Sequence, residues 1–271
     1  MRQNAPLMLA DLTWPEVQEL VGKVTVVLLP LGACEQHGPG MSLATDIVLA
    51  TEICRQVSAR LFPRVLVAPP IPWGLSDQHL GFPGTISLHP ETFYLAIRDV
   101  VSSLLGHGFR RFLLVNGHGG NMAASEVICV RLRRETAVEV VGTITYFTLT
   151  PAAAADMSHA GRLETSYALA LAPEVVKRER LTPPHLVGAL PDVAPATIPW
   201  AFHELTQTGN LGDPTGASRE QGTALVEMVL DRLCHIVTAL GEQAPAFRGY
   251  PDCREHVVES SAAGAEPPAR R

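Results

Sequence analysis

Apolar positions along the chain fall into two alternating patterns. Continuous runs rich in β-branched residues, typical of strands buried on both faces of a sheet, occupy residues 24–30, 65–68, 111–115 and 138–146. Longer segments with apolar residues every three or four positions, typical of amphipathic helices, occupy residues 46–61, 90–105, 122–135, 163–171 and 222–240. Strands that alternate with helices predict a layered α/β fold around a mostly parallel sheet.

The uninterrupted alternation of strands and helices indicates how many domains the chain has. No internal repeat or linker breaks the first 240 residues, so we predict a single domain over residues 1–250. The last stretch, residues 255–271, is small, polar and contains proline. Such composition cannot bury enough apolar surface to fold, so we predict a disordered tail over residues 251–271.

Composition narrows the class of protein. The chain of 271 residues is 46% hydrophobic and 18% charged, with a formal net charge of −6, which is typical of a globular protein and unlike a nucleic-acid binder. No apolar run reaches the roughly 18 residues that a membrane helix needs. The five cysteines are scattered and odd in number, so we expect no disulfide framework and a cytoplasmic setting.

Polar residues with chemical potential follow the first predicted strand. Parallel sheets place active sites at the carboxyl ends of their strands. The segment from residue 31 to residue 46 carries Glu35, His37 and Asp46. Two carboxylates and an imidazole form a plausible ligand set for zinc or manganese. The alternative is structural, with Asp46 as a helix N-cap and His37 as a turn residue.

A glycine-rich turn follows the strand at residues 111–115. Its sequence, VNGHGGN, surrounds His118 with Gly117, Gly119 and Gly120. A histidine in so flexible a turn is poorly placed for core packing and well placed for a metal ion, while the neighbouring amides can hold an oxyanion. The alternative is a flexible turn with an incidental histidine.

A third segment, HAGRLETS, contributes Glu164 and His159. Glu164 lies near the start of a predicted helix, where a carboxylate also serves as a cap. His159 precedes it in a loop and is a candidate proton shuttle or a solvated loop residue. Taken together, the three segments offer two histidines and three carboxylates for two divalent ions. A water bridging two such ions is acidified to a hydroxide that can hydrolyse an amide.

Four segments carry a resemblance to a known family: GACEQHGPGMSLATD, FPGTISL, NGHGGN and HAGRLETS. In this order, over roughly residues 9–240, they resemble the creatinine amidohydrolase (creatininase) family. The resemblance implies a three-layer α/β/α sandwich and a site for two divalent metal ions per protomer, Zn²⁺ or Mn²⁺. It also implies a homo-oligomer, by analogy a hexamer.

The resemblance assigns ligands residue by residue. Glu35 and His118 would hold one ion, His37 the other, and Asp46 would bridge both. Creatininase carries a Tyr-Glu pair, its Glu a metal ligand, where this chain has a Gly-Gly pair. Glu164 is then the natural replacement ligand. His159, at the head of the same motif, is the expected catalytic acid or base, and Glu164 would contribute to catalysis as a ligand.

Substrate contacts are expected at Gly119 and at the loop over residues 73–84, where Ser76 and His79 are candidates. The alternative for this loop is a polar surface loop without a role. The Gly-Gly pair puts creatinine itself in doubt. The remaining substrates are another small-molecule amide, a formamide, or a short peptide as in the peptidase that trims the mycofactocin precursor.

Two alternatives of other classes stay open. One is a non-catalytic metal-binding scaffold, which the presence of all five ligands disfavours. The other is a two-metal phosphatase or nuclease, which usually holds phosphate with Arg or Lys. The three ligand segments contain only Arg162, so an amidohydrolase is the favoured interpretation.

Overall fold

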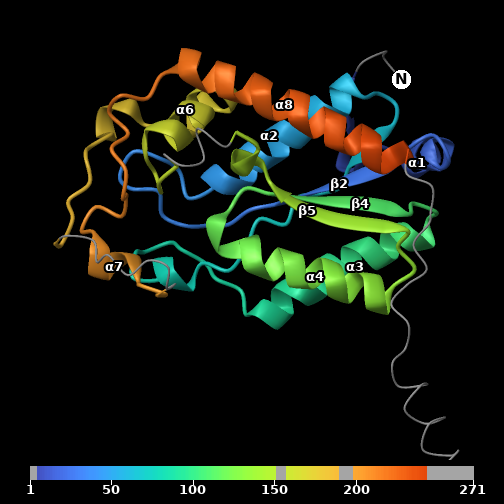
Figure 1. The fold of residues 1–271 in the computed structure, drawn as a ribbon, viewed down its shortest axis with the longest axis horizontal. Coiled ribbons are helices and arrows are strands. Elements are labelled where there is room, and N and C mark those ends of the chain that lie inside the picture. The colour runs from blue at the N-terminus through green and yellow to red at the C-terminus, as the bar shows by residue number, and fades with distance from the viewer. Residues whose placement is uncertain (1–4, 151–156, 189–197, 243–271) are drawn as a thin grey trace, which may run out of the picture.

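A five-stranded parallel sheet forms the centre of the molecule in the computed structural model, which describes residues 5–150, 157–188 and 198–242 (Figure 1). The strands are β1 (Leu7–Met8), β2 (Val26–Leu31), β3 (Val65–Val67), β4 (Arg111–Asn116) and β5 (Val140–Thr145), in the order β1-β3-β2-β4-β5. All neighbouring strands pair in parallel. The mostly parallel sheet predicted from the sequence is therefore confirmed.

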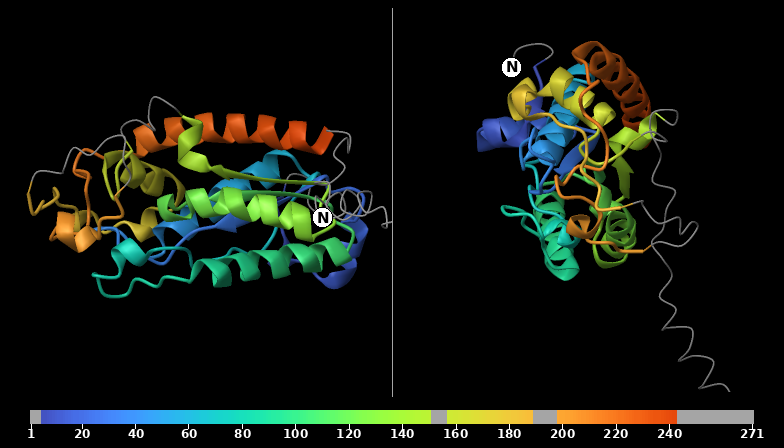
Figure 2. Two further views of the ribbon diagram at one scale, coloured as in Figure 1. Left: turned by 60° about the horizontal axis from the view of Figure 1, so that its bottom comes forward. Right: turned by 90° about the vertical axis from the view of Figure 1, so that its left-hand side faces the viewer.

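Helices cover both faces of this sheet. One face packs against α2 (Thr45–Arg60), α6 (Arg162–Leu171) and α8 (Arg219–Glu242). The other packs against α1 (Trp14–Leu20), α3 (Pro90–Gly106) and α4 (Met122–Glu135). Side chains of β2 alternate between the two cores, with Val26 and Leu28 on one side and Val27 and Leu29 on the other. Figures 1 and 2 show this three-layer α/β/α arrangement, as predicted.

Short elements fill the connections. They are the 3-10 helices η1 (Leu9–Asp11), η2 (Asp77–His79), η3 (Gly119–Asn121), η4 (Tyr146–Leu149), η5 (Pro173–Val175) and η6 (Arg178–Arg180), and the short α7 (Phe202–Leu205). Helix α7 contacts η2, at the end of the molecule toward which the strands β2 and β4 run (Figure 1). The short elements η2, η3, η4 and α7 therefore lie over the carboxyl ends of the central strands.

Helix boundaries agree with local sequence chemistry. Pro90 occupies the first turn of α3, and the ring of His89 accepts a hydrogen bond from the N–H of Glu91. Helix α1 was not predicted, although Thr13 and Glu16 form a capping box there and Pro15 lies in its first turn. In the described part of the chain, no helix combines the length and the apolar character needed to cross a bilayer. The predicted tail at residues 251–271 lies outside the described residues.

Candidate metal centre

The candidate site lies where β2 and β4, which are direct neighbours, end side by side. Leu31 at the end of β2 pairs with Asn116 at the end of β4, so the loops that follow them are adjacent. A Cβ at Gly117 would lie 2.5 Å from the carbonyl oxygen of Asp46. Glycine at this position therefore lets the turn after β4 approach the first turn of α2.

Two asparagines of the glycine-rich turn fix the position of His118. Asn116 accepts the N–H of His118 through Oδ1 at 3.1 Å and donates through Nδ2 to the His118 carbonyl at 2.6 Å. Asn121 donates to the carbonyl of Gly32 and accepts the N–H of Leu75. These bonds join the loops after β2 and β4 to the loop that leads into η2, and they aim the imidazole of His118 inward.

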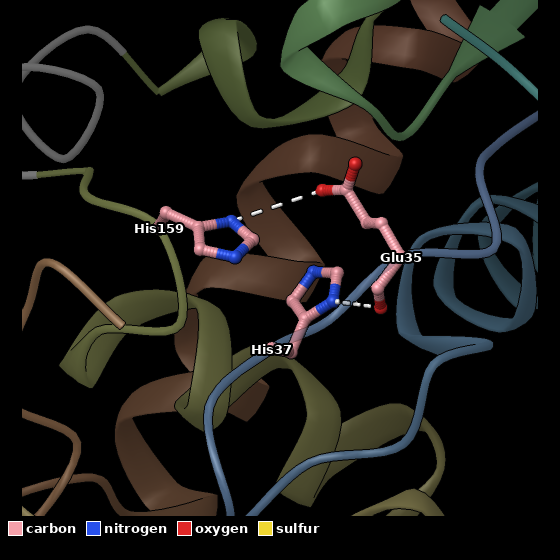
Figure 3. A group of neighbouring side chains, drawn as sticks. All are labelled: Glu35, His37 and His159. Carbon is pink, nitrogen blue, oxygen red and sulfur yellow. Dashed lines mark hydrogen bonds and ion pairs between the residues drawn. The ribbon is translucent and has the colours of Figure 1, made fainter. Parts of the chain in front are cut away.

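Five of the predicted residues converge in two overlapping groups. Glu35, Asp46 and His118 form one, and His37, Asp46 and Glu164 form the other, each with its ligand atoms within 4.8 Å of one another. Asp46 belongs to both: its Oδ1 lies 3.0 Å from Nε2 of His37, and its Oδ2 lies 3.2 Å from Nδ1 of His118. Every side chain in the two groups is buried. A third group joins Glu35 and His37 to His159 (Figure 3).

The histidines are oriented as metal ligands are. Nε2 of His118 lies 2.9 Å from the carbonyl oxygen of Leu75, and Nδ1 of His37 lies 3.1 Å from that of Glu35. A carbonyl only accepts, so each of these nitrogens carries the hydrogen. The other nitrogen of each ring is thereby aimed at the carboxylates and is the atom that would bind a metal ion, which is the second-sphere arrangement found around metal-bound histidines.

The buried negative charges of the site favour the binding of cations. In the described part of the chain, the ion pairs of Glu35, Asp46 and Glu164 are all with histidines. Burial and the charge of Asp46 raise the pKa of Glu35. Burial alone would lower the pKa of His118, but the carboxylates of Glu35 and Asp46 raise it to about 10. The buried carboxylates thus attract positive charge strongly enough to hold a proton where a cation would lie.

One oxygen in this cluster has no hydrogen bond. Oδ2 of Asp46 is buried and makes no hydrogen bond, and its ion-pair contact is with Nδ1 of His118 at 3.2 Å. A buried carboxylate oxygen without a hydrogen bond is costly, and a cation held by Glu35, Asp46 and His118 would satisfy it. Carboxylate oxygens and imidazole nitrogens are ligands that zinc and manganese accept, so the residues present fit two such ions.

The structural alternatives for two of these residues resolve differently. Asp46 is not the N-cap of α2, because Ala44 occupies that position. Glu164 lies in the first turn of α6, but its Oε2 accepts the N–H of Ala160 at 2.6 Å, one residue before the N-cap Gly161, while its Oε1 lies 3.6 Å from Nε2 of His37. The contact with Ala160 holds the second oxygen of Glu164 toward the cluster.

Two side chains in and beside η2 reach the site rather than the surface. Ser76 and His79 are both buried, which makes the surface-loop alternative wrong for them. Oγ of Ser76 donates to Oε2 of Glu35 at 2.8 Å, and Nε2 of His79 lies 3.5 Å from the same oxygen. These side chains support Glu35. Gly119, by contrast, is exposed on the wall of the cavity.

A cavity of about 220 Å³ opens beside the two groups. It is lined by the glycine-rich turn and by apolar and aromatic side chains that the sequence did not single out: Phe147, Met157 and Phe202. His159 also lines it, and burial together with the charge of His37 lowers the pKa of His159 to about 3. A neutral imidazole therefore faces the space in which a substrate would lie.

The two glycines of this wall give a matched test of the geometry. A Cβ at Gly120 would lie 2.3 Å from the carbonyl oxygen of Leu75 and 2.4 Å from Nε2 of His118, whereas a Cβ at Gly119 would meet nothing within 4 Å. We expect Gly120→Ala to displace His118, to lower the free energy of unfolding by about 1–3 kcal/mol, and to weaken zinc binding. Thermal unfolding and zinc titration check this, and equal effects from Gly119→Ala would contradict it.

The fold and the cluster define an α/β protein with a candidate binuclear metal centre. A family model described as creatinine amidohydrolase matches residues 10–237. The chain belongs to this family, the creatininases, as its motifs indicate.

Named relatives differ in what they act on. The mycofactocin precursor peptide peptidase of Mycobacterium ulcerans (strain Agy99) is 34% identical over 232 residues, covering 83% of this chain and 85% of that protein. The creatinine amidohydrolase of Pseudomonas putida is 33% identical over 269 residues, covering 88% and 98%. Both are hydrolases of carbon–nitrogen bonds.

Solved structures of the family share the fold. A structure named "Creatininase Mn" superposes with a TM-score of 0.73 at 29% identity, covering 88% of this chain and 100% of that one. Another creatininase structure is described as of the Zn-Zn type. The family fold thus carries manganese or zinc in relatives.

Proposed function

We propose that this protein is a two-metal amidohydrolase. Glu35, Asp46 and His118 would hold one divalent cation, and His37, Asp46 and Glu164 the other, with Asp46 shared. The observation that carries the proposal is the pair of buried ligand groups that meet at Asp46. Zn²⁺ and Mn²⁺ are the cations that the donor set fits and that relatives' structures are named for.

The metal ions and the side chains of the site would have different roles in the reaction. When bound, divalent cations supply Lewis acidity to a carbonyl oxygen and lower the pKa of a water. The chain's own residues must then orient the amide and move a proton. Nε2 of His159 lies 2.8 Å from the carbonyl oxygen of Gln36, while Nδ1 lies 3.8 Å from Oε1 of Glu35 at the cavity. A lone pair on Nδ1 can accept a proton from the attacking water and return it to the departing nitrogen.

The lining of the cavity supports an amide rather than a phosphate ester. Among the described residues that line the cavity there is no Arg or Lys, the side chains that usually hold a transferring phosphoryl group. Phe147 and Phe202 instead offer apolar surface, and the cavity is open at Gly119, where a Cβ would meet nothing within 4 Å. We propose a small-molecule amide or a short peptide as substrate, the open wall at Gly119 leaving room for an extended chain.

A panel of substrates tests this function. Metal-loaded protein is to be assayed against creatinine, formamido-pyrimidines, short peptides and a phosphate ester, and we expect hydrolysis of at least one amide and none of the ester. Chelation should abolish that activity and lower the melting temperature, because a ligand at 100 times its Kd stabilises the folded state by about 2.7 kcal/mol. Fewer than about one tightly bound divalent ion per protomer would instead favour a scaffold.

We further propose a homo-oligomer, by analogy a hexamer, in the cytoplasm. An apolar groove of about 680 Å³ between α1 and α3 contains Trp14, which is 77% exposed and typical of a contact surface. The four cysteines that the structure describes are all free, which suits a reducing compartment. Light scattering should give a mass several times that of one chain, and a monomer would contradict the assembly.

A further inference from the structure

Gln36 lies between two of the proposed ligands, and its side-chain amide is held in one orientation by the backbone. Oε1 accepts the N–H of Gly38 at 3.0 Å, and Nε2 donates to the carbonyl oxygen of Gly209 at 3.0 Å. An N–H only donates and a carbonyl only accepts, so these partners distinguish the oxygen of the amide from its nitrogen. The side chain is buried, and exchanging its two ends would break both bonds.

The second hydrogen on Nε2 of Gln36 could be accepted by either of two neighbouring histidine rings. Nε2 of Gln36 lies 2.9 Å from Nδ1 of His79 and 3.0 Å from Nε2 of His159. Nε2 of His159, however, also lies 2.8 Å from the backbone carbonyl oxygen of Gln36. That carbonyl requires a hydrogen on Nε2 of His159, and a protonated nitrogen cannot accept a second one. The amide hydrogen therefore goes to Nδ1 of His79.

From this geometry we propose that Gln36 is a positioning residue that sets which ring nitrogen carries the hydrogen in both His159 and His79. Its backbone carbonyl fixes the hydrogen of His159 on Nε2 and leaves a lone pair on Nδ1. Its side-chain amide keeps Nδ1 of His79 bare, which places the hydrogen on Nε2. The two rings then face Glu35 in opposite senses: Nε2–H of His79 points to Oε2 of Glu35, and bare Nδ1 of His159 points toward Oε1.

Packing holds both rings in reach of Gln36. Phe202 stacks on His79 with ring centroids 3.9 Å apart and meets His159 edge-on at 4.8 Å. Gly209 has a φ of +89°, and a Cβ there would lie 2.0 Å from Oε1 of Gln36. Only glycine allows this loop to approach closely enough to receive the amide hydrogen bond. The segments that carry His79, His159 and Gly209 thus converge on the side chain of Gln36.

The functional role of this assignment rests on the proposed function. In the proposed amidohydrolase, Nδ1 of His159 would be the proton acceptor at the cavity, and His79 would donate a hydrogen bond that holds Glu35 in place. Deuterium positions are nevertheless measurable without any substrate. The experiment is neutron diffraction from crystals of the full chain grown with Zn²⁺, for the wild type, Gln36→Glu and Gln36→Met, with zinc content measured on the same preparations. Gln18→Glu, an exposed change on α1, is the matched control.

In the wild type and in Gln18→Glu we expect deuterium on Nε2 of both rings. In Gln36→Glu the carboxylate has no hydrogen to give, so Nδ1 of His79 should gain deuterium, while Nε2 of His159 keeps its own on the unchanged carbonyl. In Gln36→Met, which keeps the shape of the side chain without the amide, nothing donates to Nδ1 of His79. Deuterium should therefore appear on that nitrogen as well. Deuterium on Nδ1 of His159 in the wild type, or an unchanged His79 in both variants, would overturn the proposal.

The two proposals fail in different ways. Crystals that take up no zinc would count against the metal centre, and the deuterium positions in those same crystals would still test Gln36. Full zinc content with the wrong deuterium positions would remove the role of Gln36 and leave the metal centre standing.

Discussion

Replacement of Asp46 by alanine should remove both metal ions and nearly all turnover. Asp46 is the one residue shared by the two ligand groups, and each of its oxygens faces a different histidine. Its loss leaves each ion with two protein ligands. Because bound metal ions lower reaction barriers by several kcal/mol, we expect kcat to fall roughly 1000-fold or more.

The measurement pairs metal analysis with kinetics on whichever amide the panel identifies. Asp99→Ala is the matched control, because Asp99 is an exposed aspartate of α3 far along the chain, where it pairs with Arg98. Asp46→Asn keeps the shape of the side chain and should also lose metal, which separates charge from packing. Near wild-type turnover with two ions per protomer in either Asp46 variant would refute the shared-ligand role.

The layered fold could be predicted because long elements carry strong periodicity. Helix α4 begins and ends at the predicted residues Met122 and Glu135, and β2, β3, β4 and β5 lie within one or two residues of the predicted runs. Strand β1 contributes only Leu7 and Met8, which is too short for a pattern. Helix α1 did carry a readable signal, since Thr13, Pro15 and Glu16 are its capping residues.

The ligand cluster could be anticipated because three of its residues follow the ends of β2 and β4 and the other two lie in the first turns of α2 and α6. What the sequence could not supply is how later loops cover it. Ser76 is held in the site by a hydrogen bond to Glu35, and His79 by a hydrogen bond with Gln36 and by the stacking of Phe202, a residue more than 120 positions away in the chain. Gln36 gave no signal of its own, because its side-chain partners at Gly209 and His79 become neighbours only after folding.

Replacement of His159 by alanine separates chemistry from metal binding. The His159 ring lies at the cavity, with Nε2 on the carbonyl of Gln36 and Nδ1 free to accept a proton. It belongs to neither of the two groups that share Asp46, although its Nδ1 is within reach of Glu35. We therefore expect full metal content and a fall in kcat of about 10²–10⁴-fold, the usual contribution of a general acid–base group.

His235→Ala removes an exposed histidine of α8 and should leave both quantities unchanged. Metal content distinguishes the two roles open to His159 by geometry, because its ring has one nitrogen held by a carbonyl, as His37 and His118 do. A variant that retains two ions and loses turnover places His159 in proton transfer. A variant that loses an ion instead makes His159 a ligand, and the proton carrier must then be sought elsewhere on the cavity wall.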